Sequence, residues 1–283
     1  MLNPKDHLIL KSSGEQQRFD EEKLSHHLLH SGINRDLTTE VINNVENNLD
    51  KINSTDDIYH NVSEYLRHQG SIDNYFNYSL RRAVDMLGPS GHPFEHFVSE
   101  ILLSQGYRTE VGVTVLGKCV THEIDVVALK DSTQYFIECK FHNTTGTKTD
   151  IQVALYTYAR YLDVKYAMEQ THGKEKEYLP WLITNTKVTS EVFDYGNCNN
   201  LKVTAWYYPE EEGLRDMIMA SKLHPVTLLY HISPHKITEL LNLNIVTLSS
   251  LREAIKKDQV SHILTDEETK HVLDDIKYLY KDE

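Results

Sequence analysis

The chain has 283 residues, with 42 acidic and 29 basic side chains and a formal net charge of −13 at pH 7. Its 40% hydrophobic and 25% charged residues are typical of a globular protein, and no run approaches the roughly 20 apolar residues that a membrane span needs. We therefore expect a cytoplasmic protein without a membrane partner, and the negative charge excludes binding to nucleic acid through diffuse electrostatic attraction alone.

The first ninety residues are predicted to form a separate, mostly helical unit. Residues 8–10 are a short apolar run typical of a strand, and the polar run after them predicts a turn centred on Gly14. Asp20 is expected to cap the helix that follows, because its carboxylate can accept a free backbone N–H of the first turn. Three more helical segments are predicted at 38–52, 56–70 and 74–87.

This order of elements resembles the ATP-cone, a small nucleotide-sensing domain known from ribonucleotide reductases and their repressor. The residues that match its pattern are Lys11, Gly14, Phe19, Asp20, Lys23, Thr55, Ile58, Tyr75, Tyr78 and Arg81. The resemblance implies a regulatory ligand, ATP or dATP, with its phosphates at Lys11 and with Gly14, Lys23 and Thr55 completing the nucleotide site.

Two positions depart from the ATP-cone pattern. Ser12 and Ser13 stand where that family usually has an arginine and an acid, which weakens the expected grip on a triphosphate. The alternative is a four-helix accessory or dimerisation module, in which Tyr75 and Tyr78 belong to the core and Lys11 is solvated. A short linker at 88–93, with two prolines and two glycines, ends this unit.

The segment from His122 to His142 carries the residues most suggestive of chemistry. Two apolar runs typical of strands are joined by a polar turn expected at residues 131–133. Side chains alternate along a strand, so Glu138 and Lys140 share one face. In a hairpin Asp125 lies beside Glu138, and two carboxylates with a nearby lysine could hold a divalent cation at a phosphodiester.

These residues resemble the PD-(D/E)xK nuclease superfamily, in which an aspartate precedes a strand bearing Glu-x-Lys. The flanking segments narrow the resemblance to Mrr-like restriction endonucleases over residues 91–210, and it implies catalytic roles for Asp125, Glu138, Lys140, Glu95 and Gln152. Asp125 and Glu138 are the implied ligands of Mg²⁺ or Mn²⁺. Glu95 belongs to the first helix, and Gln152 and Tyr156 match a QxxxY motif on a later one.

Each of these residues also has an ordinary structural explanation. Exposed hairpins often carry a glutamate and a lysine as a solvent-facing pair. Against this, Glu138 and Lys140 lie inside an apolar run, where charges are costly unless a metal, water or a partner satisfies them. Gln152 alone is typical of a helix surface, and Tyr156 alone is typical of a core.

The last sixty residues predict a small helical region. Residues 232–251 are similar to degenerate helix-hairpin-helix repeats of DNA-processing proteins, although Ser233, Pro234 and Asn242 to Asn244 replace the hairpin glycines. A packing or protein-contact role is the alternative, because the glycine amides that would face phosphate are missing.

The predicted fold class is α/β: an N-terminal, mostly helical ATP-cone, a PD-(D/E)xK restriction-endonuclease-like fold with a mixed central sheet, and the helical C-terminal region. Expected domains are 1–88, 91–210 and 224–283. The implied function is that of a Mg²⁺-dependent DNA endonuclease, a homo-oligomer regulated by ATP or dATP and used in defence against foreign DNA. The alternatives are an inactive nuclease-fold module that serves as a nucleotide-responsive sensor or scaffold, and an RNA-directed nuclease.

Overall fold

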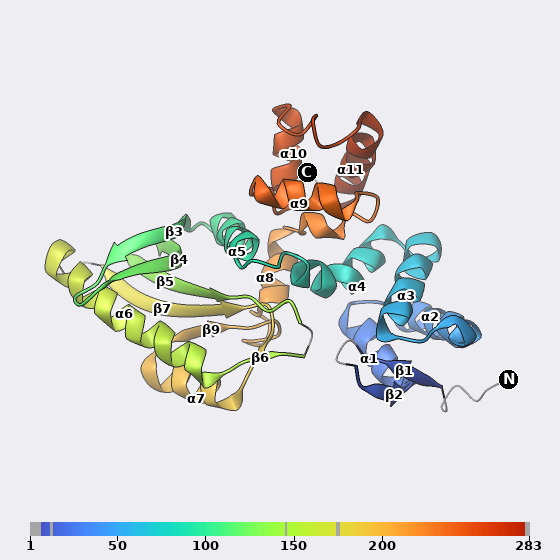
Figure 1. The fold of residues 1–283 in the computed structure, drawn as a ribbon, viewed down its shortest axis with the longest axis horizontal. Coiled ribbons are helices and arrows are strands. Elements are labelled where there is room, and N and C mark those ends of the chain that lie inside the picture. Colours follow the sequence, from blue (N-terminus) through green and yellow to red (C-terminus); the bar gives the residue numbers. More distant parts are fainter. Residues whose placement is uncertain (1–6, 12–13, 145, 174–175, 281–283) are drawn as a thin grey trace. The chain divides into compact units, whose positions relative to one another are not determined.

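The computed structural model describes residues 7–11, 14–144, 146–173 and 176–280 (Figure 1). These fall into two compact units, one ending at Arg81 and including the residues from Leu273 onward, the other running from Arg82 to Val272. The domain limits expected from the sequence stay a prediction. No helix in the described ranges is long and apolar enough to cross a membrane.

The first unit begins with a two-stranded antiparallel sheet. β1 (Leu8–Leu10) pairs with β2 (Gln16–Arg18) across the predicted turn, of which Ser12 and Ser13 lie outside the described residues. α1 (Glu21–His30) follows, and the Asp20 side chain accepts the Lys23 N–H, as the sequence predicted.

Three further helices follow α1 in the chain. α2 (Arg35–Asn47) starts three residues earlier than predicted, because the Asn34 side chain accepts the Leu37 N–H and caps the helix there. It ends at Asn47 and is followed by the short 3₁₀ turn η2 (Leu49–Lys51). α3 (Thr55–Gln69) is capped by Ser54, and α4 (Ile72–Asp85) crosses into the second unit.

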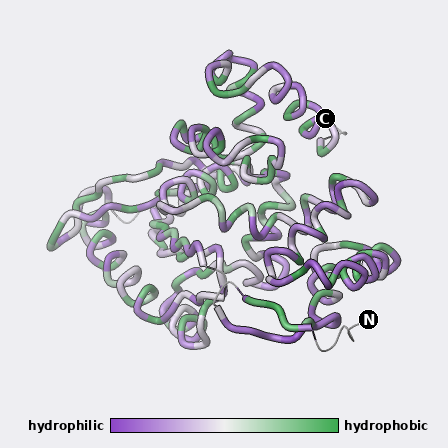
Figure 2. The backbone as a smooth tube through the Cα atoms, turned by 45° about the vertical axis from the view of Figure 1, so that its right-hand side comes forward, coloured by the Kyte–Doolittle hydropathy of each residue, from purple (hydrophilic) through white to green (hydrophobic). Residues whose placement is uncertain are grey.

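The helices of the first unit pack through one apolar face each, which is why hydrophobic and hydrophilic positions alternate along them (Figure 2). Their core includes side chains with no exposed surface at Leu28, Val41, Val45, Val62, Leu66 and Phe76. Tyr75 and Tyr78 are each 5% exposed, as expected if they belong to the core. The helical architecture is therefore as predicted, whereas the ATP-cone resemblance stays a prediction.

The second unit is built on a five-stranded mixed sheet, as the sequence predicted. Its order is β3-β4-β5-β7-β9, with antiparallel pairing from β3 to β5 and parallel pairing from β5 to β9. The strands are β3 (Arg108–Leu116), β4 (Thr121–Lys130), β5 (Thr133–Lys140), β7 (Glu177–Thr184) and β9 (Lys202–Thr204). A second small sheet pairs β6 (Lys148–Thr149) with β8 (Lys187–Val188).

Helices cover both faces of the large sheet. α5 (His92–Ser104) and α8 (Leu214–Ser221) lie on one side, and α6 (Ile151–His172) and α7 (Ser190–Asn199) lie on the other (Figure 1). The α6–α7 side is sealed by a cluster that includes Val153, Ala154, Leu182 and Val192. Such two-sided burial explains why β7 is apolar along most of its length.

The β4–β5 hairpin differs from the prediction at its turn. Thr133 belongs to β5 and pairs with Lys130, so the connection has two residues, Asp131 and Ser132, and not three. Asp131 has φ 53°, a left-handed conformation that aspartate tolerates better than most residues. The shorter turn still places Asp125 and Glu138 opposite each other.

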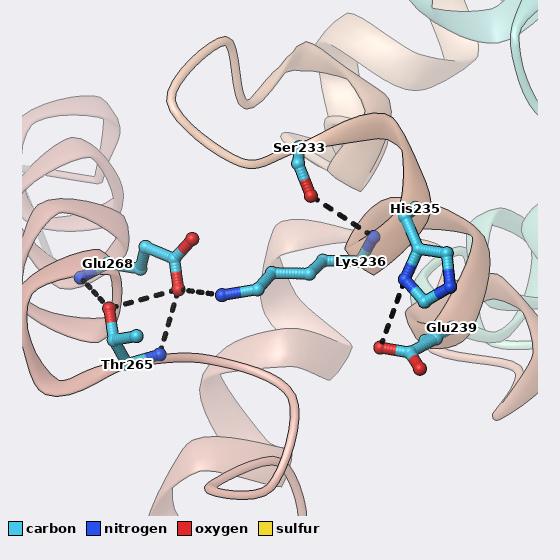
Figure 3. Close-up of polar contacts among 6 residues, drawn as sticks. All are labelled: Ser233, His235, Lys236, Glu239, Thr265 and Glu268. Carbon is cyan, nitrogen blue, oxygen red and sulfur yellow. Dashed lines mark hydrogen bonds and ion pairs between the residues drawn. The ribbon is translucent and has the colours of Figure 1, made fainter.

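The C-terminal region is helical, as predicted: η3 (Val226–Leu228), α9 (Pro234–Asn242), α10 (Leu248–Lys256) and α11 (Asp266–Leu279). The Lys236 ammonium lies 2.5 Å from the Glu268 carboxylate, and Glu268 also accepts the Thr265 N–H (Figure 3). Ser233 caps α9 through the Lys236 N–H. Lys236 is thus engaged in holding helices together, and the helix-hairpin-helix resemblance stays a prediction.

Candidate active site

The β4–β5 hairpin brings the two principal acids together. Val126 pairs with Ile137, so the same register continued by one residue sets Asp125 opposite Glu138. The Cys139 N–H donates a 2.7 Å hydrogen bond to Asp125 Oδ2 and fixes the carboxylate at the end of the paired region. Ile137 and Cys139 are buried on the other face, which leaves Glu138 and Lys140 on the shared face that the alternation predicted.

The carboxylates in this site repel one another. Burial and, after it, the charges of Glu138 and Glu95 raise the pKa of Asp125 to about 7, against the opposing effects of the Cys139 amide and Arg160. Burial also raises the pKa of Glu95, with contributions in the same direction from Glu123 and Glu138, while His92 lowers it. A divalent cation is the kind of ligand that relieves such crowding.

Glu95 enters the site from α5, as the sequence predicted. Pro93 lies in the first turn of that helix, where its missing N–H costs nothing, and Glu95 follows within the same turn. Phe94 and Phe97 on the buried face anchor the helix, and the Phe94 ring lies 5.5 Å from the Phe141 ring beyond β5. His92 Nδ1 lies 3.4 Å from Glu95 Oε2.

Glu138 is held by two side chains of α6. The Tyr156 hydroxyl donates to Oε1 at 2.9 Å, and Arg160 Nη1 lies 2.6 Å from Oε2. The expectation that Tyr156 is a core residue was therefore wrong: its side chain is 37% exposed, because the ring stands at the rim of the site. Arg160 was missed, although its position four residues after Tyr156 puts both on one face of the helix.

The Lys140 ammonium group is not engaged by another described residue and could contact a substrate. Within the described part of the chain it has no hydrogen-bonded or ion-paired partner. The chain just beyond it is fixed, because Asn185 Oδ1 accepts the His142 N–H and Asn185 Nδ2 donates to the His142 carbonyl. His142 Nε2 lies 3.0 Å from the buried Thr149 hydroxyl, which lies 3.0 Å from that of Thr184.

Gln152 is not joined to the other site residues. It lies in the first turn of α6, where its backbone N–H donates to the capping side chain of Asp150. The side chain is exposed and forms no hydrogen bond with any residue that the structure describes. Of the five residues expected to be catalytic, Gln152 is thus the one outside the cluster.

His122, near the start of β4, contacts α6. Its Nε2 lies 2.8 Å from Asp163 Oδ2, and Asp163 also accepts the N–H groups of Cys119 and Val120. These contacts fasten the β3–β4 turn onto α6. An open cavity of about 540 Å³ is lined by Cys119, Val120, His122 and Asp163 together with Tyr156, Ala159 and Arg160. Of these, Tyr156 and Arg160 are the residues that contact Glu138.

The donor set fits a hard divalent cation held largely by solvent and substrate. Mg²⁺ is usually bound through one or two carboxylates, and waters and phosphate oxygens complete its coordination shell. Asp125 and Glu138 can supply the two carboxylates. Within the described ranges no group of three or more histidine, cysteine or acidic side chains is arranged to enclose an ion. A site of this kind therefore depends on the two hairpin acids.

Three further lysines of this domain lie in different places. Lys118 stacks over the Tyr166 ring at 4.5 Å, on the β3–β4 turn. Lys148 and Lys187 are exposed register partners in the small β6–β8 sheet. Arg160 and Lys140 are the cations in contact with or beside the acids.

The residues expected to bind a nucleotide gather at one end of the first unit. Lys11 Nζ lies 2.7 Å from the Glu15 carboxylate, next to Gly14 with its φ of 83°. The hydrogen bond from Lys11 lowers the pKa of Glu15, to which Lys23 also contributes. Leu10 bridges to Ser54, which brings the strand end next to Thr55 at the start of α3.

The sheet with its acids, lysine and flanking helices defines a nuclease-like α/β domain, and the comparisons with known proteins agree. The family model Mrr_cat, described as restriction endonuclease, matches residues 87–205. An uncharacterized protein of Archaeoglobus fulgidus is 40% identical over 149 residues, which are 53% of this chain and 80% of that protein. Residues 87–205 are therefore a domain of the Mrr restriction endonuclease type.

A solved structure extends the likeness beyond that domain. The crystal structure of a protein of unknown function, AF1548, matches this chain with a TM-score of 0.56 and 34% sequence identity. The match covers 67% of this chain and 98% of that one. The nuclease-like fold is therefore shared with relatives for which no activity is stated.

Proposed function

We propose that this protein is an endonuclease that hydrolyses phosphodiester bonds of DNA with the help of Mg²⁺ or Mn²⁺. The observation that carries the proposal is the placement of Asp125 opposite Glu138, with Lys140 on the same face and no partner for it within the described residues. When bound, the cation supplies Lewis acidity that activates water and offsets charge on the phosphate. The match of residues 87–205 to a restriction endonuclease family model favours DNA as the substrate.

Each residue has a proposed role. Asp125 and Glu138 bind the cation, and the Cys139 amide keeps Asp125 turned toward it. Lys140 positions the attacking water or the phosphate, since an ammonium group is a strong donor to anionic oxygen. Glu95 assists from α5, and Gln152 orients a neighbouring group once substrate covers the rim of the site.

The regulatory part of the proposal concerns the first unit. ATP or dATP binds at Lys11, Gly14, Lys23 and Thr55 and sets the activity of a cytoplasmic homo-oligomer used in defence against foreign DNA. The gathering of these residues at one end of the unit supports a nucleotide site. The Lys11–Glu15 ion pair opposes it, because a triphosphate has to displace Glu15.

One observation favours the alternative, a nuclease fold without turnover that acts as a nucleotide-responsive sensor or scaffold. Both carboxylate oxygens of Glu138 are already bonded, one to Tyr156 and one to Arg160. A site saturated in this way holds a cation less readily than one with a free carboxylate.

Cleavage of plasmid DNA by the purified full chain separates the two functions. The assay is run with Mg²⁺, Mn²⁺ or EDTA, with and without ATP and dATP, and with an RNA of matched length. We expect metal-dependent DNA cleavage that Asp125→Ala and Lys140→Ala abolish and that Glu110→Ala, a change of an exposed acid on β3, leaves intact. Nucleotide binding without cleavage of either nucleic acid would establish the scaffold.

A further inference from the structure

Arg160 is a cation built into the site by three elements. On α6, its Nη1 lies 2.6 Å from Glu138 Oε2 on β5 and donates to the Glu123 carbonyl of β4 at 3.3 Å. The guanidinium lies 5.6 Å from the centre of the Tyr156 ring, and its side chain is 28% exposed. The group is therefore held in place but reachable from solvent.

The charges around Arg160 leave the site short of cations. Four acids, Glu95, Glu123, Asp125 and Glu138, influence one another here through their charges. On a chain with a net charge of −13, a phosphodiester that approaches them meets repulsion. Among the residues that the structure describes, Lys140 and Arg160 are the lysine and arginine at this end of the hairpin, and Arg160 is partly neutralised by Glu138.

The guanidinium also has unused donors. Both of its contacts are made by Nη1, and its other nitrogens bind no acceptor among the residues that the structure describes. Arginine presents five N–H groups in a planar fork that matches two phosphate oxygens at once. One guanidinium can thus hold Glu138 and still offer an edge to a phosphate.

We propose that Arg160 is a second phosphate-binding residue of this site, held ready by Glu138. In the metal-free site it neutralises Glu138 and keeps that carboxylate in position. With a divalent cation on Glu138 this ion pair would weaken, and the unused edge of the guanidinium would donate to a phosphate oxygen of the nucleic acid. The inference rests on the proposed function, because it assigns a substrate contact to the same site.

The proposal predicts opposite effects on two ligands. A guanidinium beside a carboxylate repels a divalent cation that binds the same carboxylate, so its removal favours the cation. As a donor to phosphate it attracts nucleic acid, so its removal disfavours DNA. If Arg160 only braced α6 against the sheet, its loss would weaken both ligands together and lower the unfolding temperature.

The experiment measures each ligand separately on the full-length protein. Mn²⁺ binding is titrated without DNA by electron paramagnetic resonance of the free ion, and binding of a DNA duplex is followed by fluorescence anisotropy in Ca²⁺. The variants are Arg160→Gln and Arg160→Lys. Lys165→Gln is the matched control, because it removes one positive charge from the same helix at a residue that contacts Tyr161 and Glu169 and not the hairpin acids.

We expect Arg160→Gln to tighten Mn²⁺ binding about five- to tenfold by removing a like charge. The same change weakens DNA binding about tenfold and lowers the slope of log affinity against log salt by about one. Arg160→Lys keeps Mn²⁺ affinity within about twofold, because the charge remains, and weakens DNA about threefold, because the fork is lost. Lys165→Gln leaves both affinities near those of the parent.

Weaker Mn²⁺ binding by Arg160→Gln, or DNA binding equal to the parent, would overturn the proposal. If Arg160→Gln does not fold, Arg160→Lys decides: parent-like DNA affinity overturns the proposal, and a selective loss of DNA affinity supports it. The proposed function fails separately, if the parent protein cuts no nucleic acid with any metal. In that case opposite shifts of Mn²⁺ and DNA affinity would still establish the Arg160 assignment.

Discussion

The Cys139 amide donates a 2.7 Å hydrogen bond to the Asp125 carboxylate across the β4–β5 hairpin. Through this bond the backbone of β5, the strand that carries Glu138, fixes the position of the Asp125 carboxylate. It replaces the ladder pairing that stops at Val126 and Ile137. The acid is therefore positioned by backbone geometry and not by a flexible side chain.

Asp125 makes the metal-free protein less stable above neutral pH. Its folded pKa of about 7 lies above the ordinary value of 3.8, so its stabilising effect is complete below about pH 4 and is lost as the pH rises through 7. Asp125→Asn keeps an acceptor for the Cys139 amide and removes the charge. In EDTA we expect it to raise the free energy of unfolding at pH 8 by about 2–4 kcal/mol.

The measurement is urea unfolding at pH 8 and pH 4.5, and at pH 4.5 the gain from Asp125→Asn should fall to about 1 kcal/mol or less. Glu110→Gln, at an exposed acid on β3, should change stability little at either pH. An equal gain at both pH values would show that the carboxylate is not strained by its neighbours.

Tyr156 should matter through its hydroxyl. Tyr156→Phe removes the 2.9 Å hydrogen bond to Glu138 and keeps the ring against Arg160. A hydrogen bond to a charged group contributes about 1.5–3 kcal/mol, so we expect cleavage to slow by at least about tenfold. Tyr166→Phe on the same helix is the control, and equal rates for both variants would remove Tyr156 from the site.

Protonation of His224 should lower the stability of the second unit at acid pH. Burial lowers its pKa to about 4, so the neutral ring contributes fully above 6.5 and stability is lost as the pH falls toward 4. Between pH 7 and 4.5 the parent should lose about 2–3 kcal/mol more than His224→Phe, which keeps a ring but does not titrate. Parallel loss in the two proteins, measured by denaturant unfolding, would contradict this.

Much of the fold was readable from local patterns. Asp20 correctly predicted the start of α1. The alternation of side chains along β5 correctly predicted that Glu138 and Lys140 share a face. The mixed sheet was predicted from the resemblance of residues 91–210 to Mrr-like restriction endonucleases. The start of α2 was misplaced because Asn34 caps it, and asparagine is as common in turns as at helix starts.

The candidate site was predicted only in part, for a physical reason. Asp125, Glu138 and Lys140 are close in sequence and joined by one hairpin, so strand periodicity sufficed to group them. The contact of Arg160 with Glu138 depends on the angle at which α6 crosses the sheet. No local sequence pattern encodes that angle. The prediction therefore chose Gln152 and missed Arg160, which lies two turns further along the same helix.

Gly117 should tolerate no side chain. A Cβ there would lie 2.7 Å from the Val120 carbonyl and overlap the Asp163 carboxylate that holds the β3–β4 turn on α6. We expect Gly117→Ala to destabilise the protein by about 1–3 kcal/mol through overpacking. Thr114→Ala, at an exposed position of β3, should stay near the parent in thermal unfolding, and a harmless Gly117→Ala would mean that the turn is not clamped.

The central claim is that one divalent cation lies between Asp125 and Glu138 beside a phosphate. It is tested most directly by anomalous diffraction from crystals of the Lys140→Ala protein with Mn²⁺ and a short DNA duplex. We predict a manganese peak in contact with both carboxylates and with a phosphate oxygen. A manganese ion bound elsewhere, or carboxylates that turn apart with DNA present, would contradict the claim.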